Sequence, residues 1–179
     1  KRITWRRFNE PGVIADVWTM NPDGTDERQI TDYGSMSWAP YIHPSGQYIL
    51  FASNKLGFEN FEVFMVDING AREPVRITYA DGFDGLPVPS PDGRRIAWTT
   101  SRAGGREGQI FLADWNDAAA VNALNTAPLR GAGLPAGQTA GLPAATSWHS
   151  CANWGCRWSQ PSTLSSVSPG LTNGGSCES

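Results

Sequence analysis

Short apolar runs alternate with turns rich in Gly, Pro, Asn and Asp along the first 115 positions of the chain. The run QYILFAS (47–53) is almost wholly apolar, which predicts a strand buried on both faces. FEVFMVD (61–67) predicts a second strand, and the INGA that follows it (68–71) contains Asn-Gly, which is typical of a tight hairpin. The pattern predicts antiparallel strands joined by short turns.

Two further strands complete one unit. SMSWAPYI (35–42) predicts a first strand, in which Pro40 must lie where no hydrogen-bond donor is needed. PVRIT (74–78) predicts a short fourth strand, whose proline suits the outermost position. Residues 35–78 are therefore predicted to form one four-stranded antiparallel sheet.

This unit recurs along the chain. PSGQYILFASNK (44–55) and PDGRRIAWTTSR (91–102) begin 47 positions apart, and ADVWTM (15–20) lies 46 positions before FEVFMV. Four short strands every 40 to 50 residues or so are the signature of a β-propeller blade. The sequence thus predicts an all-β fold, a β-propeller fragment of about two and a half four-stranded antiparallel blades. The predicted blades cover residues 1–31, 35–78 and 84–115.

The segments MNPDGTDERQIT, PSGQYILFASNK and PSPDGRRIAWTTSR, followed by GQIFLADW, resemble the TolB-like propeller repeat, which is a WD40-like repeat. The resemblance covers about residues 1–115. It implies a periplasmic, exported, non-enzymatic scaffold that binds other proteins or peptides, such as those of the Tol-Pal envelope system. The alternative that it implies is the accessory, non-catalytic propeller of an exported peptidase whose catalytic domain is absent here.

The number of predicted blades and the start of the chain bear on its origin. Because two and a half blades do not close a ring, we interpret the chain as a piece of a longer propeller. The sequence begins at Lys1 without a signal segment, which we interpret as a processed chain or a fragment.

After Trp115 the composition changes. NDAAAVNAL (116–124) predicts a short helix with Asn116 or Asp117 as its N-cap, within a Pro/Gly/Ala linker region at 116–147. The Cys/Trp/Ser-rich tail at 148–179 is predicted to be mostly disordered. We interpret the tail as a linker to an absent domain or as a frameshift product, and we prefer both interpretations to a small motif closed by a disulfide.

Charge and hydropathy exclude some partners. The net charge is −3 and the pI about 5.3, which argues against binding to nucleic acid or to an anionic membrane surface. No apolar run reaches the length of about 18 residues that a membrane span needs, so no membrane insertion is expected.

No catalytic or cofactor motif is found. The sequence lacks G-x-S-x-G, H-E-x-x-H and a phosphate-binding loop, so we predict neither enzymatic activity nor a cofactor. His43 is predicted to be a solvated turn residue.

No metal site is predicted. His149, Cys151 and Cys156 fit no standard zinc spacing. A disulfide between these two cysteines is the minority interpretation, and Cys177 makes the number of cysteines odd. Asp81 and Asp84 are interpreted as turn-capping residues rather than as calcium ligands.

Candidate partner-binding residues lie in the loops that share one face of a propeller. Aromatic side chains with cations are the composition that anchors protein interfaces. The alternative interpretation of Phe58 and Phe83 is that their side chains wedge between neighbouring blades. The matched positions of Lys55 and Arg102 favour a repeated structural role, a bond to loop carbonyls. The candidates are Tyr33, Lys55, Phe58, Tyr79, Phe83, Arg102 and Arg106.

Overall fold

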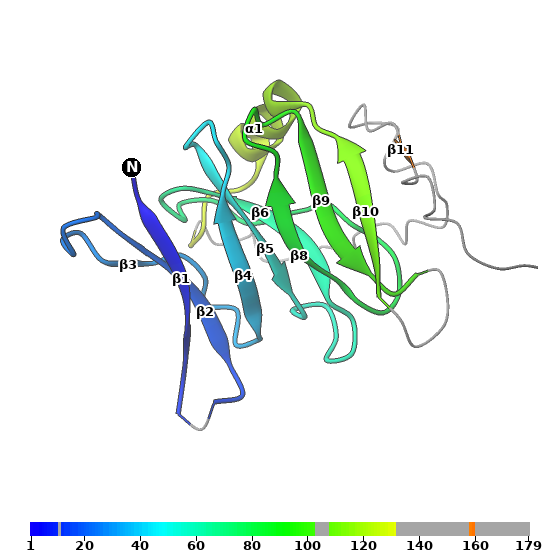
Figure 1. The fold of residues 1–179 in the computed structure, drawn as a ribbon. Helices are drawn as coiled ribbons and strands as arrows, with labels where there is room; N and C mark the ends of the chain where they lie inside the picture. Colours follow the sequence, from blue (N-terminus) through cyan, green and yellow to red (C-terminus); the bar gives the residue numbers. More distant parts are fainter. Residues whose placement is uncertain (11, 103–107, 132–157, 160–179) are drawn as a thin grey trace, which may run out of the picture.

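The computed structural model describes residues 1–10, 12–102, 108–131 and 158–159. Three antiparallel sheets follow one another along the chain and lie side by side in a row (Figure 1). The first blade comprises β1 (Ile3–Phe8), β2 (Ala15–Met20) and β3 (Arg28–Gln29). The second blade comprises β4 (Ser37–Ile42), β5 (Tyr48–Ser53), β6 (Glu62–Asp67) and β7 (Val75–Arg76). The third blade comprises β8 (Asp84–Pro89), β9 (Arg95–Thr100), β10 (Gln109–Asp114) and β11 (Trp158–Ser159).

The order of strands in each sheet confirms the predicted fold class. In the second blade the hydrogen-bonded order is β4-β5-β6-β7, as expected for a blade whose strands pair in chain order. β11 was not predicted: in the third blade Ala113 of β10 pairs with Trp158, and Leu112 pairs with Ser159. A segment far along the chain thus supplies the fourth strand of the last blade.

Matched bulges interrupt the first strands of the second and third blades. Ala39 has φ of 44° and Leu86 has φ of 56°, and in both strands the pairing register shifts at this point. Pro40 and Pro87 follow directly, inside the bulge. Since bulged residues are left out of the ladder, the prolines forfeit no hydrogen bond there, as the sequence predicted for Pro40.

Two apolar layers hold the three blades together. β5 lies between the layers, so its residues are buried on both faces, as predicted. Alternate side chains of β5 and β6 point to opposite layers because of the period of two in a strand. The layer between the first and second blades contains Val17, Ile30, Ile49, Phe51, Phe64 and Val66. The layer between the second and third blades contains Tyr48, Leu50, Val63, Met65, Ile96, Trp98, Ala113, Trp115, Ala120 and Leu124.

The predicted helix forms as α1 (Asp117–Thr126), close to the end of β10 (Figure 1). Asn116 is its N-cap, and the side chain of Asn116 accepts a hydrogen bond from the backbone N–H of Ala119 at 3.0 Å. Ala120 and Leu124 are buried against the layer between the second and third blades. No helix of the described residues is long and apolar enough to span a membrane.

Residues 127–131, here called the strap, follow α1 and cross the second blade at the turn between β6 and β7. The Arg72 guanidinium donates to the carbonyl of Ala127 at 2.6 Å, and the backbone N–H of Arg130 donates to the carbonyl of Ala71 at 2.9 Å. The Arg130 guanidinium then reaches the first blade, where it donates to the carbonyl of Ile30 at 2.6 Å. A segment that leaves the third blade therefore contacts both other blades.

A polar network recurs in the first and second blades. Thr31 Oγ1 accepts from the backbone N–H of Val17 at 2.9 Å and donates to Asp16 at 2.9 Å. In the second blade, Thr78 Oγ1 accepts from the backbone N–H of Val63 at 2.9 Å and donates to Glu62. This network fixes the end of the outer strand to the start of the strand beside it.

Candidate functional site

The loops predicted to bind partners lie together at one end of the blades, here called the loop end. The loop between β5 and β6 is tied to the segment before β4, because the backbone N–H of Met36 donates to Asn54 Oδ1 at 2.8 Å. The segment before β8 is tied to β6 by paired hydrogen bonds between Phe61 and residues 82 and 84. These contacts bring the predicted loops to one surface.

Tyr33 and Lys55 pack on each other at the loop end. The Lys55 ammonium lies 4.1 Å from the centre of the Tyr33 ring, and the Arg130 guanidinium lies 5.5 Å from the same ring. Burial lowers the pKa of Lys55 and raises the pKa of the Tyr33 hydroxyl. Both side chains are partly buried, so they support the surface more than they protrude from it.

Phe58 and Tyr79 protrude from the loop end. Phe58 is 85% exposed, so it does not wedge between blades. Tyr79 is 42% exposed, and its ring lies 4.5 Å from the Arg76 guanidinium. Both aromatic side chains are therefore exposed at the loop end.

Phe83, in contrast, packs at the junction of the second and third blades. Its ring lies 5.6 Å from the ring of Phe61, and the backbone N–H of Phe83 donates to Ser101 Oγ at 2.8 Å. A Cβ at Gly85 would approach the Phe83 ring to 2.6 Å, so a glycine is needed beneath the ring. Phe83 therefore matches the wedging alternative. Arg106 lies outside the described residues.

Lys55 and Arg102 each lie near an aromatic ring, and these two rings occupy matched positions in the third strand of their blades. The Arg102 guanidinium lies 5.1 Å from the centre of the Phe111 ring, and the Lys55 ammonium lies 6.0 Å from that of Phe64. Arg102 also forms an ion pair with the fully buried Asp84. Cation–π contact with the third strand is thus a repeated structural feature of these two cations.

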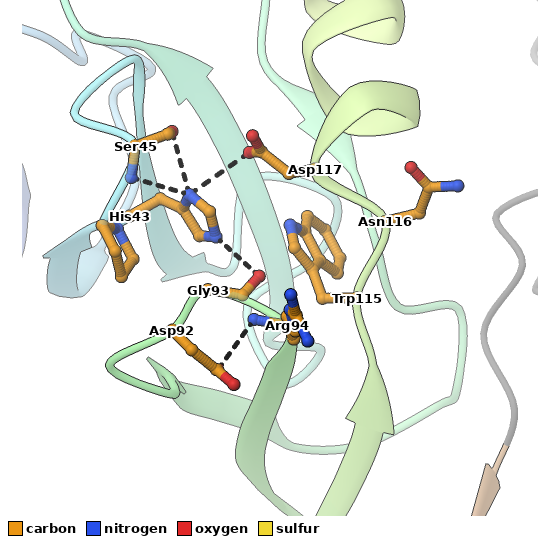
Figure 2. Close-up of a pocket in the computed structure, with 9 residues that line it drawn as sticks. His43, Ser45, Asp92, Gly93, Arg94, Trp115, Asn116 and Asp117 are labelled. Carbon is orange, nitrogen blue, oxygen red and sulfur yellow. Dashed lines mark hydrogen bonds and ion pairs between the residues drawn. The ribbon is translucent and has the colours of Figure 1, made fainter.

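A hollow of about 600 Å³ lies at the opposite end of the blades, here called the turn end (Figure 2). It is formed by the turns β4–β5 and β8–β9, by the residues that precede α1 and by the first residue of α1. The residues around it are His43, Pro44, Ser45, Asp92, Gly93, Arg94, Trp115, Asn116 and Asp117. Sequence reasoning did not predict this hollow, because its walls come from turns of two different blades and from the helix.

His43 was predicted to be solvated, and this prediction is wrong: the residue is 2% exposed. Its ring stacks on Tyr48 with centroids 4.5 Å apart, and its Nε2 lies 3.2 Å from the carbonyl oxygen of Gly93 (Figure 2). A Cβ at Gly93 would come within 2.9 Å of the imidazole, so the β8–β9 turn closes over His43 only because residue 93 is glycine.

Polar contacts link the helix to this histidine. Asp117 Oδ1 lies 3.3 Å from His43 Nδ1 and accepts a hydrogen bond from the Tyr48 hydroxyl at 2.8 Å. The same hydroxyl accepts from Trp115 Nε1 at 2.6 Å. Burial raises the pKa of Tyr48, so this hydroxyl stays neutral and can donate. The network fixes the start of α1 to the second blade.

Ser45, His43 and Asp117 are the residue types of a catalytic triad, but their geometry is different. In a triad the serine and the carboxylate bond to opposite ring nitrogens. Here Ser45 Oγ lies 2.9 Å and Asp117 Oδ1 3.3 Å from the same atom, Nδ1, while Nε2 faces the Gly93 carbonyl. With both side chains at Nδ1, His43 cannot take a proton from Ser45 on one ring nitrogen while Asp117 orients the ring through the other, and the arrangement is suited to holding the two turns and the helix together.

Among the described residues, no group of three His, Cys, Asp or Glu side chains is placed to hold a metal ion. Asp84 is fully buried and Asp81 is exposed, so these two carboxylates face different surroundings. His149, Cys151, Cys156 and Cys177 lie outside the described residues.

Solved structures share this arrangement of blades. The chain is similar to a protein assigned as TolB from Agrobacterium tumefaciens, with 24% identity and a TM-score of 0.55 over 64% of this chain and 42% of that one. The blades have the TolB-type propeller fold. TolB from Acinetobacter baumannii shares this propeller with 18% identity and a TM-score of 0.54, over 72% of this chain and 29% of its own. The chain thus spans less than half the length of either TolB structure, and neither a family model nor a curated protein matches its sequence.

Proposed function

We propose that the chain is a non-enzymatic scaffold that binds other proteins or peptides at its loop end, as part of an exported, periplasmic TolB-type propeller. The observation that carries the proposal is the exposure of Phe58 and Tyr79 on neighbouring loops of that end. Exposed aromatic side chains are a recurring feature of protein-binding surfaces.

The loop that carries Phe58 is held by its own hydrogen bonds. The side chain of Asn54 donates to the carbonyl of Phe58 at 3.2 Å, and the backbone N–H of Gly57 donates to the carbonyl of Asn54 at 3.0 Å. A partner that binds here would order little further backbone, which lowers the entropic cost of association. This supports Phe58 as an anchor for a partner.

The Tyr79 side of the surface is also fixed in place. The Tyr79 hydroxyl donates to the carbonyl of Arg76 at 3.2 Å, and the Arg76 guanidinium forms an ion pair with the buried Glu62. The guanidinium therefore keeps its place beside the Tyr79 ring, with one flank towards solvent. An aromatic ring with a neighbouring cation favours peptides that carry acidic and apolar residues together.

The proposal is tested by selecting peptides from a displayed library on the immobilised chain and measuring their affinity for variants. Phe58→Ala is expected to weaken binding about tenfold or more, as for a typical interface anchor. Gln47→Ala is the matched control, because Gln47 is exposed in a turn at the opposite end. Failure to select any peptide, or an equal loss of affinity in both variants, would contradict the proposal.

A further inference from the structure

Glu62 is a buried carboxylate whose charge is balanced by one cation. It begins β6 and is fully buried, and its oxygens accept hydrogen bonds from the Arg76 guanidinium and the Thr78 hydroxyl. Among the described residues, the other charged group that acts on Glu62 is Asp84 at the start of β8, which is itself paired with Arg102. Because a carboxylate out of water needs a compensating cation, the charge of Glu62 depends on Arg76.

Arg76 has donors left for a second carboxylate. Its Nε donates to the carbonyl of Thr78 at 2.6 Å, and its Nη2 pairs with Glu62. Its Nη1 has no acceptor among the described residues, and the side chain of Arg76 is 25% exposed. A guanidinium carries five N–H donors and binds carboxylates through them. A carboxylate of a partner can therefore bind Nη1 from solvent, beside the Tyr79 ring that lies 4.5 Å from the guanidinium.

A partner carboxylate on Arg76 would disfavour the charge of Glu62. Two like charges on one guanidinium repel each other, and a proton on one of them removes the repulsion. Burial raises the pKa of Glu62 and Asp84 adds to this effect, against the hydrogen bonds from Thr78 and Arg76. Glu62 is therefore the carboxylate that takes the proton, and the full charge of Arg76 is then left to the partner.

We propose that an acidic peptide binds Arg76 with uptake of a proton by Glu62, so that the loop end binds such a peptide more tightly as pH falls. The proton comes from solvent and returns to solvent when the peptide leaves. Because coupling between two binding events is reciprocal, the peptide raises the proton affinity of Glu62 by the same factor by which the proton raises the affinity for the peptide. This inference rests on the proposed function, since it describes how binding at the loop end is regulated.

The test uses peptides selected from a displayed library on the immobilised chain at about pH 5.5, with affinities measured by calorimetry up to about pH 8. The selected peptides are expected to contain Asp or Glu. Their affinity should fall about fivefold or more over this range, the lower end of typical coupling between sites. Titrations in buffers of different ionisation enthalpy should show net proton uptake on binding. In Glu62→Gln the fall and the proton uptake should both disappear, because glutamine is uncharged at every pH.

Two further measurements separate this coupling from a general effect of charge or of folding. Glu27→Gln is the matched control, because Glu27 forms an exposed ion pair with Arg7. This variant loses the same charge and should keep the pH dependence of the unchanged chain. Nuclear magnetic resonance of the Glu62 carboxyl in the unchanged chain needs no substitution, and the peptide is expected to raise the pH at the midpoint of its titration.

The outcomes distinguish the coupling from the proposed function. Selected peptides without acidic residues, the same pH dependence in the unchanged chain and in Glu62→Gln, or a titration of Glu62 that the peptide leaves unchanged would each overturn the coupling. Each of these results leaves peptide binding at the loop end in place. Failure to select any peptide would contradict the proposed function and the coupling together.

Discussion

Gly46 and Gly93 occupy the same position in two matched turns, and both adopt the left-handed region, with φ of 73° and 69°. They differ in their neighbours. A Cβ at Gly46 would meet nothing within 4 Å, whereas a Cβ at Gly93 would press on the imidazole of His43. The pair therefore separates the cost of the backbone conformation from the cost of displacing the histidine.

Gly93→Ala is expected to lower the free energy of unfolding by about 2–3 kcal/mol, and Gly46→Ala by about 1 kcal/mol, which is typical of alanine in the left-handed region. The difference arises because Gly93→Ala also disturbs the stacking of His43 on Tyr48. Urea unfolding of the two variants and of the unchanged chain measures both values. Equal losses would show that His43 moves aside without cost.

Glu62 is a fully buried carboxylate that accepts hydrogen bonds from Thr78 and Arg76. Burial raises the pKa of Glu62 above its ordinary value of 4.5, although both hydrogen bonds oppose this shift. A raised pKa means that the folded chain binds a proton more tightly than the unfolded chain. Its contribution to stability is therefore present below pH 4.5 and is lost as pH rises through the folded pKa.

Glu62→Gln is expected to flatten the pH dependence of stability above pH 4.5, because glutamine stays neutral and its one carbonyl oxygen can still accept from one of the two donors. The unchanged chain should lose more stability than the variant across this window. Urea unfolding at a series of pH values measures the difference. Glu59→Gln is the control at an exposed position, and identical slopes for all three chains would contradict the prediction.

At the scale of elements, the strap and α1 connect all three blades. α1 packs on the layer between the second and third blades, and the strap carries Arg130 to the first blade. Ile30, whose carbonyl accepts from Arg130, is fully buried. Loss of the Arg130 donor therefore leaves this carbonyl oxygen without a hydrogen bond. Arg130 also pairs with Asp32.

Arg130→Ala is expected to lower the free energy of unfolding by about 1–3 kcal/mol, the range for leaving a buried acceptor unpaired. Arg94→Ala removes the same charge from an exposed side chain at the turn end and should change stability by about 0.5 kcal/mol or less. Chemical denaturation of both variants checks the difference. Similar small losses in both would mean that water replaces the Arg130 guanidinium at Ile30.

The strands could be predicted from the sequence because their signals are local. Apolar runs, Asn-Gly turns and the 46–47-residue spacing are all visible without knowledge of distant contacts. The placement of Pro40 where no hydrogen-bond donor is needed followed from proline chemistry, and the helix from its N-cap and its alanines. These features needed no information from another blade.

The elements that were missed depend on distant partners. β11 has two residues, and it pairs with β10, more than forty positions earlier. The strap has a linker-like composition, and its backbone is ordered by Arg72 and by carbonyls of other blades. His43 is buried by Gly93 of the next blade, which no local pattern around residue 43 reveals.

At the scale of the whole molecule, three blades in a row bury two junctions. The two buried junctions stabilise the chain as nearest-neighbour interfaces do in repeat proteins, where each unit depends on the next. The middle blade is buried on both sides and should be the most stable of the three. The candidate binding residues Phe58 and Tyr79 extend from this blade or directly after it.

The distant origin of β11 has a consequence for how the chain folds. The first ten strands and α1 are synthesised before Trp158, because synthesis proceeds from the N-terminus. Until β11 arrives, β10 is an edge strand that can template association with another nascent chain. Closing so long a loop is entropically slow compared with forming the hairpins. The interval before β11 pairs is therefore the period in which aggregation competes most strongly with folding, and chaperone capture at that stage would protect the third blade.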